Sequence, residues 1–386
     1  MPRNYSGDLC LVVASYTLAC YARPGAGCGD VFSKITKTDI ELEGRVMNNT
    51  HFVILAGGSG QRLWPLSTKD CPKHLIPFIG QKSLLQQAID RILSLAASYK
   101  NIWIITNDYQ LNKIKDHVDH QINIISEPAA RNTAPAILFT CHKIQAVEKD
   151  ATIIILPADH FIPDQQAFLY DLNNICDFVQ ANNKIATIGI KPTFPATGYG
   201  YIQAGLNVDN NVYTVEKFHE KPSTDQANQY IKQDNMFWNG GIFVGKLNTF
   251  LHEFEVNAPK LSSDMHKFFD EKLDYHDLEN ISIDYAVMEQ SRNIVVIPTS
   301  FEWSDVGNLN VFLSLQQKFQ PAKTEIISID GQNNLASTNK KVIVFIGLSD
   351  LCVVETDNVI LISKKEAVES VKKALPQISK THQNTL

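Results

Sequence analysis

Apolar and polar positions alternate in blocks along residues 51–190 of this 386-residue chain. Short apolar runs, typical of strands covered on both faces, recur between longer stretches with apolar residues at helical spacing. The predicted strands are 51–57, 101–106, 122–126, 151–159 and 184–190. The predicted helices are 85–96, about 107–120, 132–147 and 168–179. This alternation predicts a doubly wound, mostly parallel mixed sheet.

The pattern changes twice beyond this region. Between about 198 and 245 shorter strands follow one another, which predicts an antiparallel flap set into the sheet. Two or three helices over 246–289 and a strand at 293–298 return to the main layer. After Pro321 four short apolar strands and a helix over 364–375 predict a small β-domain. Some sixty residues make a marginal core, so this domain should pack against another part of the protein.

The beginning of the chain continues neither pattern. Its longest apolar stretch, Leu9–Tyr21, falls short of the roughly 18 residues of a membrane span. Asp8 and the lack of a small-x-small cleavage site argue against a signal peptide. The expected organisation is a disordered or wrongly assigned extension that the fold does not need, a domain built on the doubly wound sheet and a β-rich domain, over residues 1–49, 50–320 and 321–386.

Composition narrows the class of protein. Hydrophobic residues make up 44% of the chain and charged residues 20%, which is ordinary for a globular protein. A net charge of −6 argues against general binding of nucleic acid or an anionic membrane, so neither is expected as a partner. The seven cysteines are odd in number and lack C-x-x-C spacing. We therefore expect neither a disulfide framework nor a zinc site, and a reducing, cytoplasmic location.

The string LAGGSGQRLWPLSTKDCPKHLIP, residues 55–77, is the first chemical signal. Its glycines would let backbone N–H groups approach a phosphate; they are Gly57, Gly58 and Gly60. Leu63 stands where a dinucleotide fingerprint needs its third glycine, and the G-K-[ST] of a Walker A loop is absent. Arg62 and Lys73 instead bracket a loop that contains prolines. Two cations beside a glycine turn suit a triphosphate that is attacked rather than merely held.

This string resembles the signature of the sugar-nucleotide pyrophosphorylases, and in detail that of the mannose-1-phosphate guanylyltransferases. Further motifs recur in the family's order: EPAARNTAPA (127–136), LPADH (156–160), TGYGYI (197–202), FHEKP (218–222), FWNGGIF (237–243), SIDYAVME (282–289) and WSDVG (303–307). The resemblance covers about 50–365 and implies a Rossmann-like nucleotidyltransferase fold with a short β-helix-like domain behind it. His74 departs from the family, many of whose members have glutamine at that position.

Two aspartates from distant motifs are candidate metal ligands. Asp159 follows a strand at the carboxyl end, where open α/β sheets bind ligands, although a lone aspartate there is more often a cap or turn residue. Together with Asp305 of WSDVG it would make a Mg²⁺ site completed by phosphate oxygens and water. The resemblance implies that both aspartates bind the metal and that Arg62, Lys73 and Asp159 are catalytic. His160 is assigned a supporting role.

The nucleotide base is expected near the start of the 132–147 helix. A carboxylate there would accept hydrogen bonds from the N1–H and amino group of guanine, a pairing that adenine cannot make. The alternative is helix capping by Asn132, with Arg131 structural. The resemblance favours binding, and its nucleotide-binding set is Leu55, Ala56, Gly57, Gly58, Gly60, Arg62, Glu127, Asn132 and Thr133.

The sugar phosphate is assigned to three further motifs. Glu220 and Lys221 are neighbours on a predicted strand, so they should face opposite ways unless the chain bends at Pro222. Without the resemblance, an exposed charge pair would be the simpler interpretation. The resemblance implies a sugar phosphate-binding set of Gly198, Tyr199, Glu220, Lys221, Asn239 and Gly240. Trp238 and Trp303 are expected in the core, and Asp284 has no assigned role.

The resemblance implies transfer of GMP from GTP to α-D-mannose 1-phosphate, with release of pyrophosphate and Mg²⁺ as cofactor. A general base is unnecessary, because the second pKa of the sugar phosphate is about 6. The alternatives are another nucleotide and hexose 1-phosphate, or a non-catalytic sugar-nucleotide sensor, which would be expected to lose metal ligands or loop cations. The chain leaves no room for the isomerase domain of longer members, so we expect the transfer alone. The apolar strands of the β-domain predict a homodimer formed through that domain.

Overall fold

The computed structural model describes residues 45–58, 60–299, 301–320, 324–338 and 341–381. Residues 1–44 of the expected extension lie outside this part. Met47 is buried and bridges to Ala96, and Arg45 forms an ion pair of 2.8 Å with Asp177. The described chain therefore makes packing contacts before the first strand, β1, begins at Thr50.

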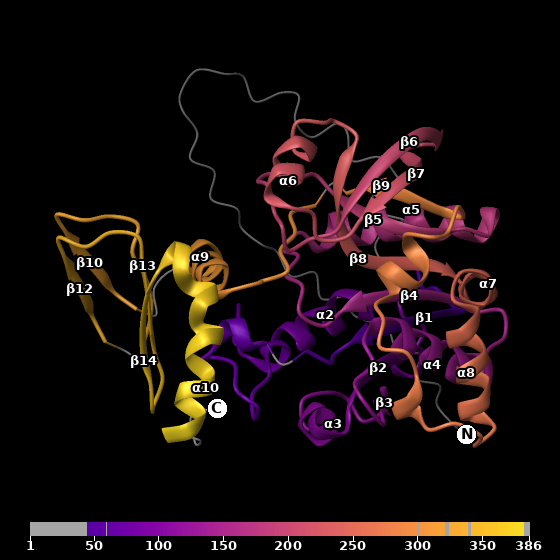
Figure 1. The fold of residues 1–386 in the computed structure, drawn as a ribbon, viewed down its shortest axis with the longest axis horizontal. Helices are drawn as coiled ribbons and strands as arrows, with labels where there is room; N and C mark the ends of the chain where they lie inside the picture. The colour runs from indigo at the N-terminus through magenta and orange to yellow at the C-terminus, as the bar shows by residue number, and fades with distance from the viewer. Residues whose placement is uncertain (1–44, 59, 300, 321–323, 339–340, 382–386) are drawn as a thin grey trace, which may run out of the picture. The chain divides into compact units, whose positions relative to one another are not determined.

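Within the described residues, nine strands form one mixed sheet in the order β3-β2-β1-β4-β8-β5-β9-β7-β6 (Figure 1). The strands are β1 (Thr50–Leu55), β2 (Ile102–Asn107), β3 (Asn123–Glu127), β4 (Thr152–Pro157), β5 (Ile185–Ile190), β6 (Tyr201–Asp209), β7 (Val212–His219), β8 (Met236–Lys246) and β9 (Ile294–Pro298). The first four are parallel to one another, and β9 is parallel to β5. The predicted mixed fold is confirmed, and the predicted antiparallel flap is set into the sheet through β8, which lies between β4 and β5.

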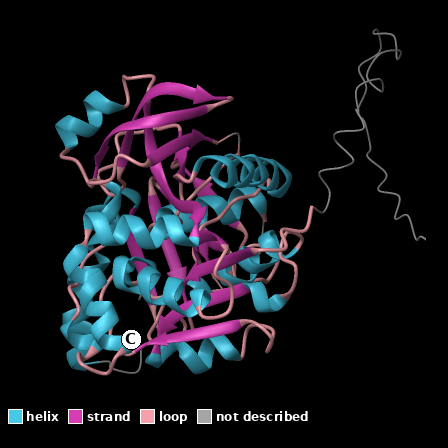
Figure 2. Ribbon diagram, turned by 90° about the vertical axis from the view of Figure 1, so that its right-hand side faces the viewer, coloured by secondary structure: helices cyan, strands magenta, loops and turns pink. Residues whose placement is uncertain are grey.

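Helices cover both faces of this sheet (Figure 2). Successive side chains of a strand point to opposite faces, so Phe52 and Ile54 enter one hydrophobic cluster and Val53 the other. The first cluster contains residues of α2 (Leu84–Leu93), α3 (Asp108–Lys115) and α5 (Gln165–Asn182); the second contains residues of α4 (Thr133–Gln145), α7 (Leu247–Asn257) and α8 (Pro259–Phe269). None of the helices in the described ranges has the length and apolar character to cross a membrane.

The C-terminal part contains short strands in two small sheets, within the described residues. They are β10 (Ile326–Ile329), β11 (Leu335–Ser337), β12 (Ile343–Ile346), β13 (Leu351–Glu355) and β14 (Ile360–Lys364). Pairing of β10 with β12 and of β11 with β13 is parallel, so these strands join the next but one, as in a coiled chain, whereas β13 and β14 pair antiparallel. The predicted final helix begins as a 3₁₀ turn, Lys365–Ser370, and continues as α10 (Val371–Thr381).

A third hydrophobic cluster joins this β-domain to the catalytic domain. It contains Leu63 of the glycine-rich string, Phe312 of α9 (Leu309–Phe319), Val354 of β13, and Val368 just before α10. All four side chains are at most 3% exposed, so the core is continuous across the predicted boundary near residue 320. The expectation that the small domain packs on another part of the protein is confirmed.

Candidate active site

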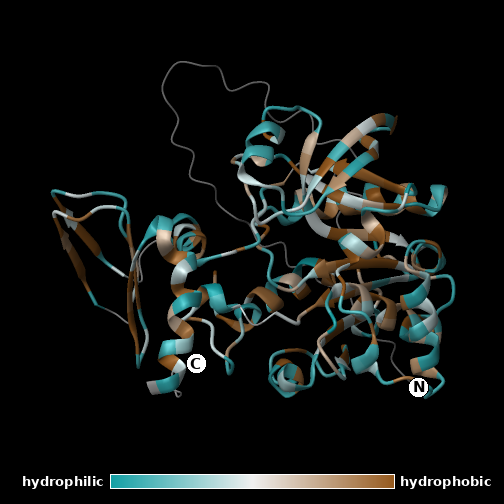
Figure 3. Ribbon diagram, viewed as in Figure 1, coloured by the Kyte–Doolittle hydropathy of each residue, from teal (hydrophilic) through white to brown (hydrophobic). Residues whose placement is uncertain are grey.

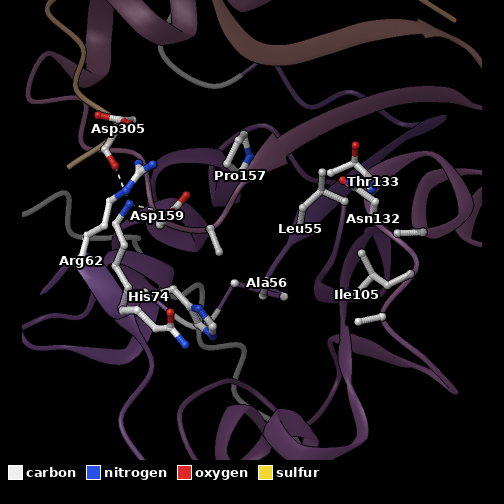
Figure 4. A pocket seen from close by; sticks show the side chains of 18 of the residues that line it. Leu55, Ala56, Arg62, His74, Ile105, Asn132, Thr133, Pro157, Asp159 and Asp305 are labelled. Atoms are coloured by element: carbon white, nitrogen blue, oxygen red, sulfur yellow. Dashed lines mark hydrogen bonds and ion pairs between the residues drawn. The ribbon is translucent and has the colours of Figure 1, made fainter. Parts of the chain in front are cut away.

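A cavity of about 590 Å³ lies at the carboxyl ends of β1, β3 and β4 (Figure 4). Every predicted nucleotide-binding residue lines it, as do Lys73, Asp159 and Asp305. Figure 4 shows Arg62 near the two aspartates at one end of the cavity, with Asn132 at the other end. Charged and less polar groups are therefore separated along its length.

The glycine-rich turn is packed tightly against Lys73. Gly60 has a φ of +62°, and a β-carbon added there would lie 2.5 Å from the Lys73 Cβ. The Ser67 hydroxyl donates a hydrogen bond to the Gly60 carbonyl. Glycine is required at this position both for its backbone conformation and for the close approach. Arg62 follows in a 3₁₀ turn, Gln61–Leu63, that is held by the buried Leu63 side chain.

Lys73 joins the two candidate metal ligands. Its ammonium donates to Asp159 Oδ2 at 2.7 Å and to the main-chain carbonyl oxygen of Asp305. Burial opposes ionisation of Asp159, but the charge and hydrogen bond of Lys73, together with the nearby His160 and His74, outweigh it and lower the pKa of this carboxyl. Phe161 and Ser304 form an antiparallel bridge with N–O distances of 2.8 and 3.0 Å. This bridge brings the LPADH and WSDVG turns together although they lie far apart in the sequence.

The two carboxylates fit a magnesium ion. The Tyr199 hydroxyl donates to Asp305 Oδ1 at 2.7 Å, and within the described part of the chain the structure records no partner for Asp159 Oδ1 or Asp305 Oδ2. Carboxylate oxygens are hard donors of the kind that Mg²⁺ prefers. No group of three or more acidic, histidine or cysteine side chains is arranged around a metal position in the described residues. Most of the coordination shell would therefore come from substrate and water.

Glu127 ends β3 at the less polar end of the cavity. Its side chain is 8% exposed, and the Tyr275 hydroxyl donates to Glu127 Oε2 at 3.0 Å. Burial raises the pKa of Glu127 to about 7, although the Tyr275 hydrogen bond favours the ionised form. A carboxylate held by one oxygen keeps its other oxygen available for a ligand.

Asn132 and Thr133 have structural roles as well as positions in the cavity wall. Asn132 is the N-cap of α4, and its side chain accepts a hydrogen bond from the Thr133 main-chain N–H. The Thr133 hydroxyl accepts a hydrogen bond of 2.9 Å from the Ile283 main-chain N–H. Capping and binding, which were alternatives in the sequence, are thus compatible.

The sugar phosphate-binding candidates lie outside the lining of this cavity, as far as the described residues show. Tyr199 connects them to it through its hydrogen bond to Asp305. Glu220 and Lys221 form an ion pair, since a φ of +44° at Lys221 bends the chain and lets neighbouring side chains meet. Gly198 and Gly240 belong to the same region, where Gly240 packs against the Ile188 carbonyl.

Asn239 is held by three hydrogen bonds. Its oxygen accepts from the Thr187 hydroxyl at 3.1 Å and from the Gly241 main-chain N–H at 3.0 Å. Its amide donates to Asp284 Oδ1 at 3.0 Å. Burial, assisted by the charge of Glu220, raises the pKa of Asp284 to about 6. Asp284 therefore orients Asn239, which is a role that the sequence did not suggest.

The model of the nucleotidyl transferase family matches residues 51–321, and that of the MannoseP isomerase/GMP-like beta-helix domain matches residues 324–378. A mannose-1-phosphate guanylyltransferase of Salmonella muenchen is 33% identical over 356 residues, which are 86% of this chain and 74% of the relative. The mannose-1-phosphate guanylyltransferase RfbM of Salmonella typhimurium is 35% identical over 86% of this chain and 73% of its own. The chain belongs to the mannose-1-phosphate guanylyltransferase family.

The predicted resemblance is thereby confirmed, and the protein is an enzyme of the nucleotidyl transferase class. A crystal structure described as mannose-1-phosphate geranyltransferase from Thermus thermophilus has a TM-score of 0.77 at 28% identity, over 86% of this chain and 99% of that chain. This likeness includes the C-terminal domain, because it spans more of the chain than residues 51–321 alone.

Two residues of this guanylyltransferase-family site come from segments without a recognisable motif. Tyr275, which contacts Glu127, lies in a 3₁₀ turn beyond α8. Lys372, which lines the cavity, lies in α10 of the C-terminal domain. Of the tryptophans expected in the core, Trp238 is buried, whereas Trp303 is half-buried and donates to His160 Nδ1 at 3.1 Å.

Proposed function

We propose that the protein transfers GMP from GTP to α-D-mannose 1-phosphate, giving GDP-mannose and pyrophosphate. The observation that carries this proposal is one cavity that is lined both by a buried carboxylate, Glu127, and by a charged end where Arg62 lies near the two aspartates. Guanine presents two adjacent N–H donors to such a carboxylate. The names of the relatives support the same sugar phosphate and nucleotide.

The reaction is an in-line displacement at the α-phosphorus of GTP. An oxygen of the sugar phosphate forms the new P–O bond while the bond to the β-phosphate breaks, and its electron pair leaves with pyrophosphate. The attacking phosphate has a second pKa of about 6 and is largely dianionic near neutral pH, so no proton has to be removed. What the protein must supply is alignment and positive charge.

Asp159 and Asp305 would hold Mg²⁺, which supplies countercharge to the phosphate oxygens when bound. Lys73 keeps the two turns that carry these aspartates together. Arg62, exposed at the mouth of the glycine turn, binds the triphosphate. The space beside Gly57 and Gly58 is open, since a β-carbon at either position would have no heavy atom within 4 Å, and this leaves room for their main-chain N–H groups to bind the same phosphates.

Lys221 neutralises the sugar phosphate, and Glu220 accepts hydrogen bonds from the hexose hydroxyls. The oxygen of Asn239 already accepts two hydrogen bonds, so Asn239 contributes the second N–H of its amide as a donor to a hydroxyl. Glu220 already accepts from Lys221, and its side chain is only 6% exposed, so it is oriented before the sugar binds. Tyr199 lies between this region and Asp305 and thereby couples the position of the sugar to the charged end of the cavity. Preformed orientation of this kind lowers the cost of aligning two anionic substrates.

A pyrophosphate-release assay across the four ribonucleoside triphosphates and several hexose 1-phosphates tests the proposal. GTP with mannose 1-phosphate should give the highest kcat/KM. A different best pair would refute the substrate assignment and leave the nucleotidyl transferase class intact. Absence of release with every pair would refute catalysis by this site.

We propose a homodimer formed through the C-terminal domain. The ribbon of β10 and β12 is coloured as hydrophobic in Figure 3. Their apolar side chains are exposed and in register, with Ile327 beside Val344 and Ile329 beside Ile346. Ile362 of β14 is 67% exposed. Apolar patches of this kind on a monomer mark interaction surfaces, and a second copy of the same strands would cover them.

Ile346→Lys combined with Ile362→Lys should convert this dimer to a monomer at micromolar concentration, because two buried charges would face an apolar interface. Light scattering coupled to gel filtration measures the mass. Val147→Lys is the matched control, since Val147 is 66% exposed, like Ile346, but lies beyond α4. A double variant with the mass of the wild type would place the interface elsewhere.

We also propose a reducing, cytoplasmic location for this protein. Cys71, Cys141, Cys176 and Cys352 are free thiols. Burial raises the pKa of Cys141 and of Cys176 to about 12, so these thiols are unreactive. Unpaired cysteines in this number are typical of proteins from reducing compartments.

A further inference from the structure

Helix α10 of the C-terminal domain runs beside the glycine-rich turn. Lys372 in its first turn lines the 590 Å³ cavity together with Gly58, Arg62 and Lys73. Further along the helix, Leu375, Pro376 and Ser379 line a neighbouring cavity of about 450 Å³, whose other wall includes Gln61 and Trp64. Figure 1 shows the same proximity of α10 to the indigo segment that carries the turn. Helix α10 therefore lies beside the glycine-rich turn from Lys372 to Ser379.

The start of α10 is fixed by packing. Val368 and Val371 are 3% and 7% exposed, and Val368 belongs to the cluster that also holds Leu63 of the turn. Asn308, at the start of α9, donates to Glu369 Oε1 at 3.3 Å. Because one core anchors both the glycine turn and the residues before α10, the position of Lys372 relative to the turn is set by the fold.

The cations at the charged end of the cavity differ in their availability. Lys73 is paired with Asp159 at 2.7 Å and only 12% of its side chain is exposed. For Arg62 and Lys372, by contrast, no hydrogen bond or ion pair is recorded with any described residue, and both are exposed. The positive charge that can move onto a triphosphate therefore resides on Arg62 and Lys372.

We propose that Lys372 binds the β- and γ-phosphates of the nucleotide and the pyrophosphate that leaves, so that the C-terminal domain supplies a catalytic residue. The inference rests on the function proposed above. When the bond between the α-phosphorus and the bridging oxygen breaks, its electron pair adds negative charge to the pyrophosphate. An ammonium group at that place stabilises the departing anion more than the bound nucleotide. The sugar phosphate is served by Lys221, which does not line the cavity that Lys372 lines.

Lys372→Met tests this assignment, with Lys372→Arg as the conservative variant. Lys373→Met is the matched control, because Lys373 is the next residue of the same helix, is exposed and does not line the cavity. In Lys372→Met, kcat/KM for GTP and, in the reverse reaction, for pyrophosphate should fall about 10- to 100-fold, the usual effect of losing one charge-assisted hydrogen bond. The KM values for mannose 1-phosphate and GDP-mannose should not change, and arginine should restore most of the loss.

Calorimetric titration of the enzyme in EDTA with pyrophosphate provides a readout without turnover. The dissociation constant should rise about tenfold or more in Lys372→Met and remain at the wild-type value in Lys373→Met. Equal behaviour of the two methionine variants, or an equal loss for all four substrates, would overturn the role of Lys372. A wild type that binds pyrophosphate through Lys372 but transfers no nucleotide would instead refute the proposed function alone.

Discussion

Asp159→Asn and Asp305→Asn are each expected to lower kcat by about 10²- to 10³-fold, the usual cost of losing a preorganised electrostatic group. Each change keeps the shape of the side chain and removes one negative charge from the candidate metal site. Asp305→Asn is the cleaner variant, because Lys73 binds the main-chain carbonyl of Asp305 and that contact is retained. Initial rates at several Mg²⁺ concentrations, with melting temperatures for both variants, are the measurements.

If Asp159 and Asp305 hold the same metal ion, three further results are expected. Raising the Mg²⁺ concentration should restore part of the rate in each single variant. The double variant should be far less impaired than the product of the single effects, because the two aspartates act as one unit. GTP binding in EDTA should be unchanged or tighter, since negative charge near the phosphates has been removed. Asp177→Asn, a change on the surface at the ion pair with Arg45, is the control. Full activity of either variant at ordinary Mg²⁺ would remove that aspartate from the metal site.

Glu127→Gln is expected to lower kcat/KM for GTP by about 10²- to 10⁴-fold and to leave the low activity with ATP nearly unchanged. The wild-type carboxylate would accept two hydrogen bonds from guanine, each worth about 1.5–3 kcal/mol when the acceptor is charged. In the variant, the single carbonyl oxygen of the glutamine accepts the hydrogen bond from the Tyr275 hydroxyl, so the amide N–H₂ group faces the guanine donors. Competition between GTP and ATP in the release assay gives the ratio directly. An unchanged GTP/ATP ratio would show that another group reads the base.

The pH dependence provides a second test of Glu127. Burial raises its pKa in the folded protein to about 7, from an ordinary value of 4.5. Guanine needs the ionised form, so the KM for GTP should rise as pH falls below 7. At pH values between 4.5 and about 7, Glu127 takes up a proton when the protein folds. The contribution of Glu127 to stability is therefore greatest at low pH and is lost as pH rises through 7. At pH 8, Glu127→Gln should therefore melt no lower than the wild type, while its use of GTP collapses. A flat KM for GTP between pH 6 and 8 would contradict this account.

The sequence predicted the parallel half of the sheet well, because β1 and β4 are continuous apolar runs with glycine or proline after them. The position of β8 could not be predicted in the same way. Its sequence, MFWNGGIFVGK, is a strand by composition, but its place between β4 and β5 depends on pairing across the whole domain. The final helix was predicted over 364–375, yet α10 continues through Pro376 to Thr381, although proline normally interrupts a helix.

Some residues of the candidate site could likewise be predicted from the sequence, and others could not. The glycine turn, Asp159 and Glu127 could be proposed from sequence, because each directly follows an apolar strand and parallel strands bring their carboxyl ends together. Tyr275 and Lys372 could not, because nothing in the residues around them indicates which cavity they approach. Their positions follow from tertiary packing: a turn beyond α8 in one case and the shared hydrophobic cluster in the other.

The bridge between Phe161 and Ser304 has a consequence for how the enzyme becomes active as it is made. Contacts between segments so distant in the chain form slowly, and domains generally fold during synthesis from the N-terminal side. On the ribosome, strands β1 to β4 would already be able to pair while the segment carrying Asp305 was still untranslated. The hydrophobic cluster that holds the glycine turn through Leu63 would be completed even later, when Val368 has been synthesised. Nascent chains would thus pass through a stage with a partly assembled sheet and no competence for nucleotidyl transfer, and catalysis would begin only when α10 had docked.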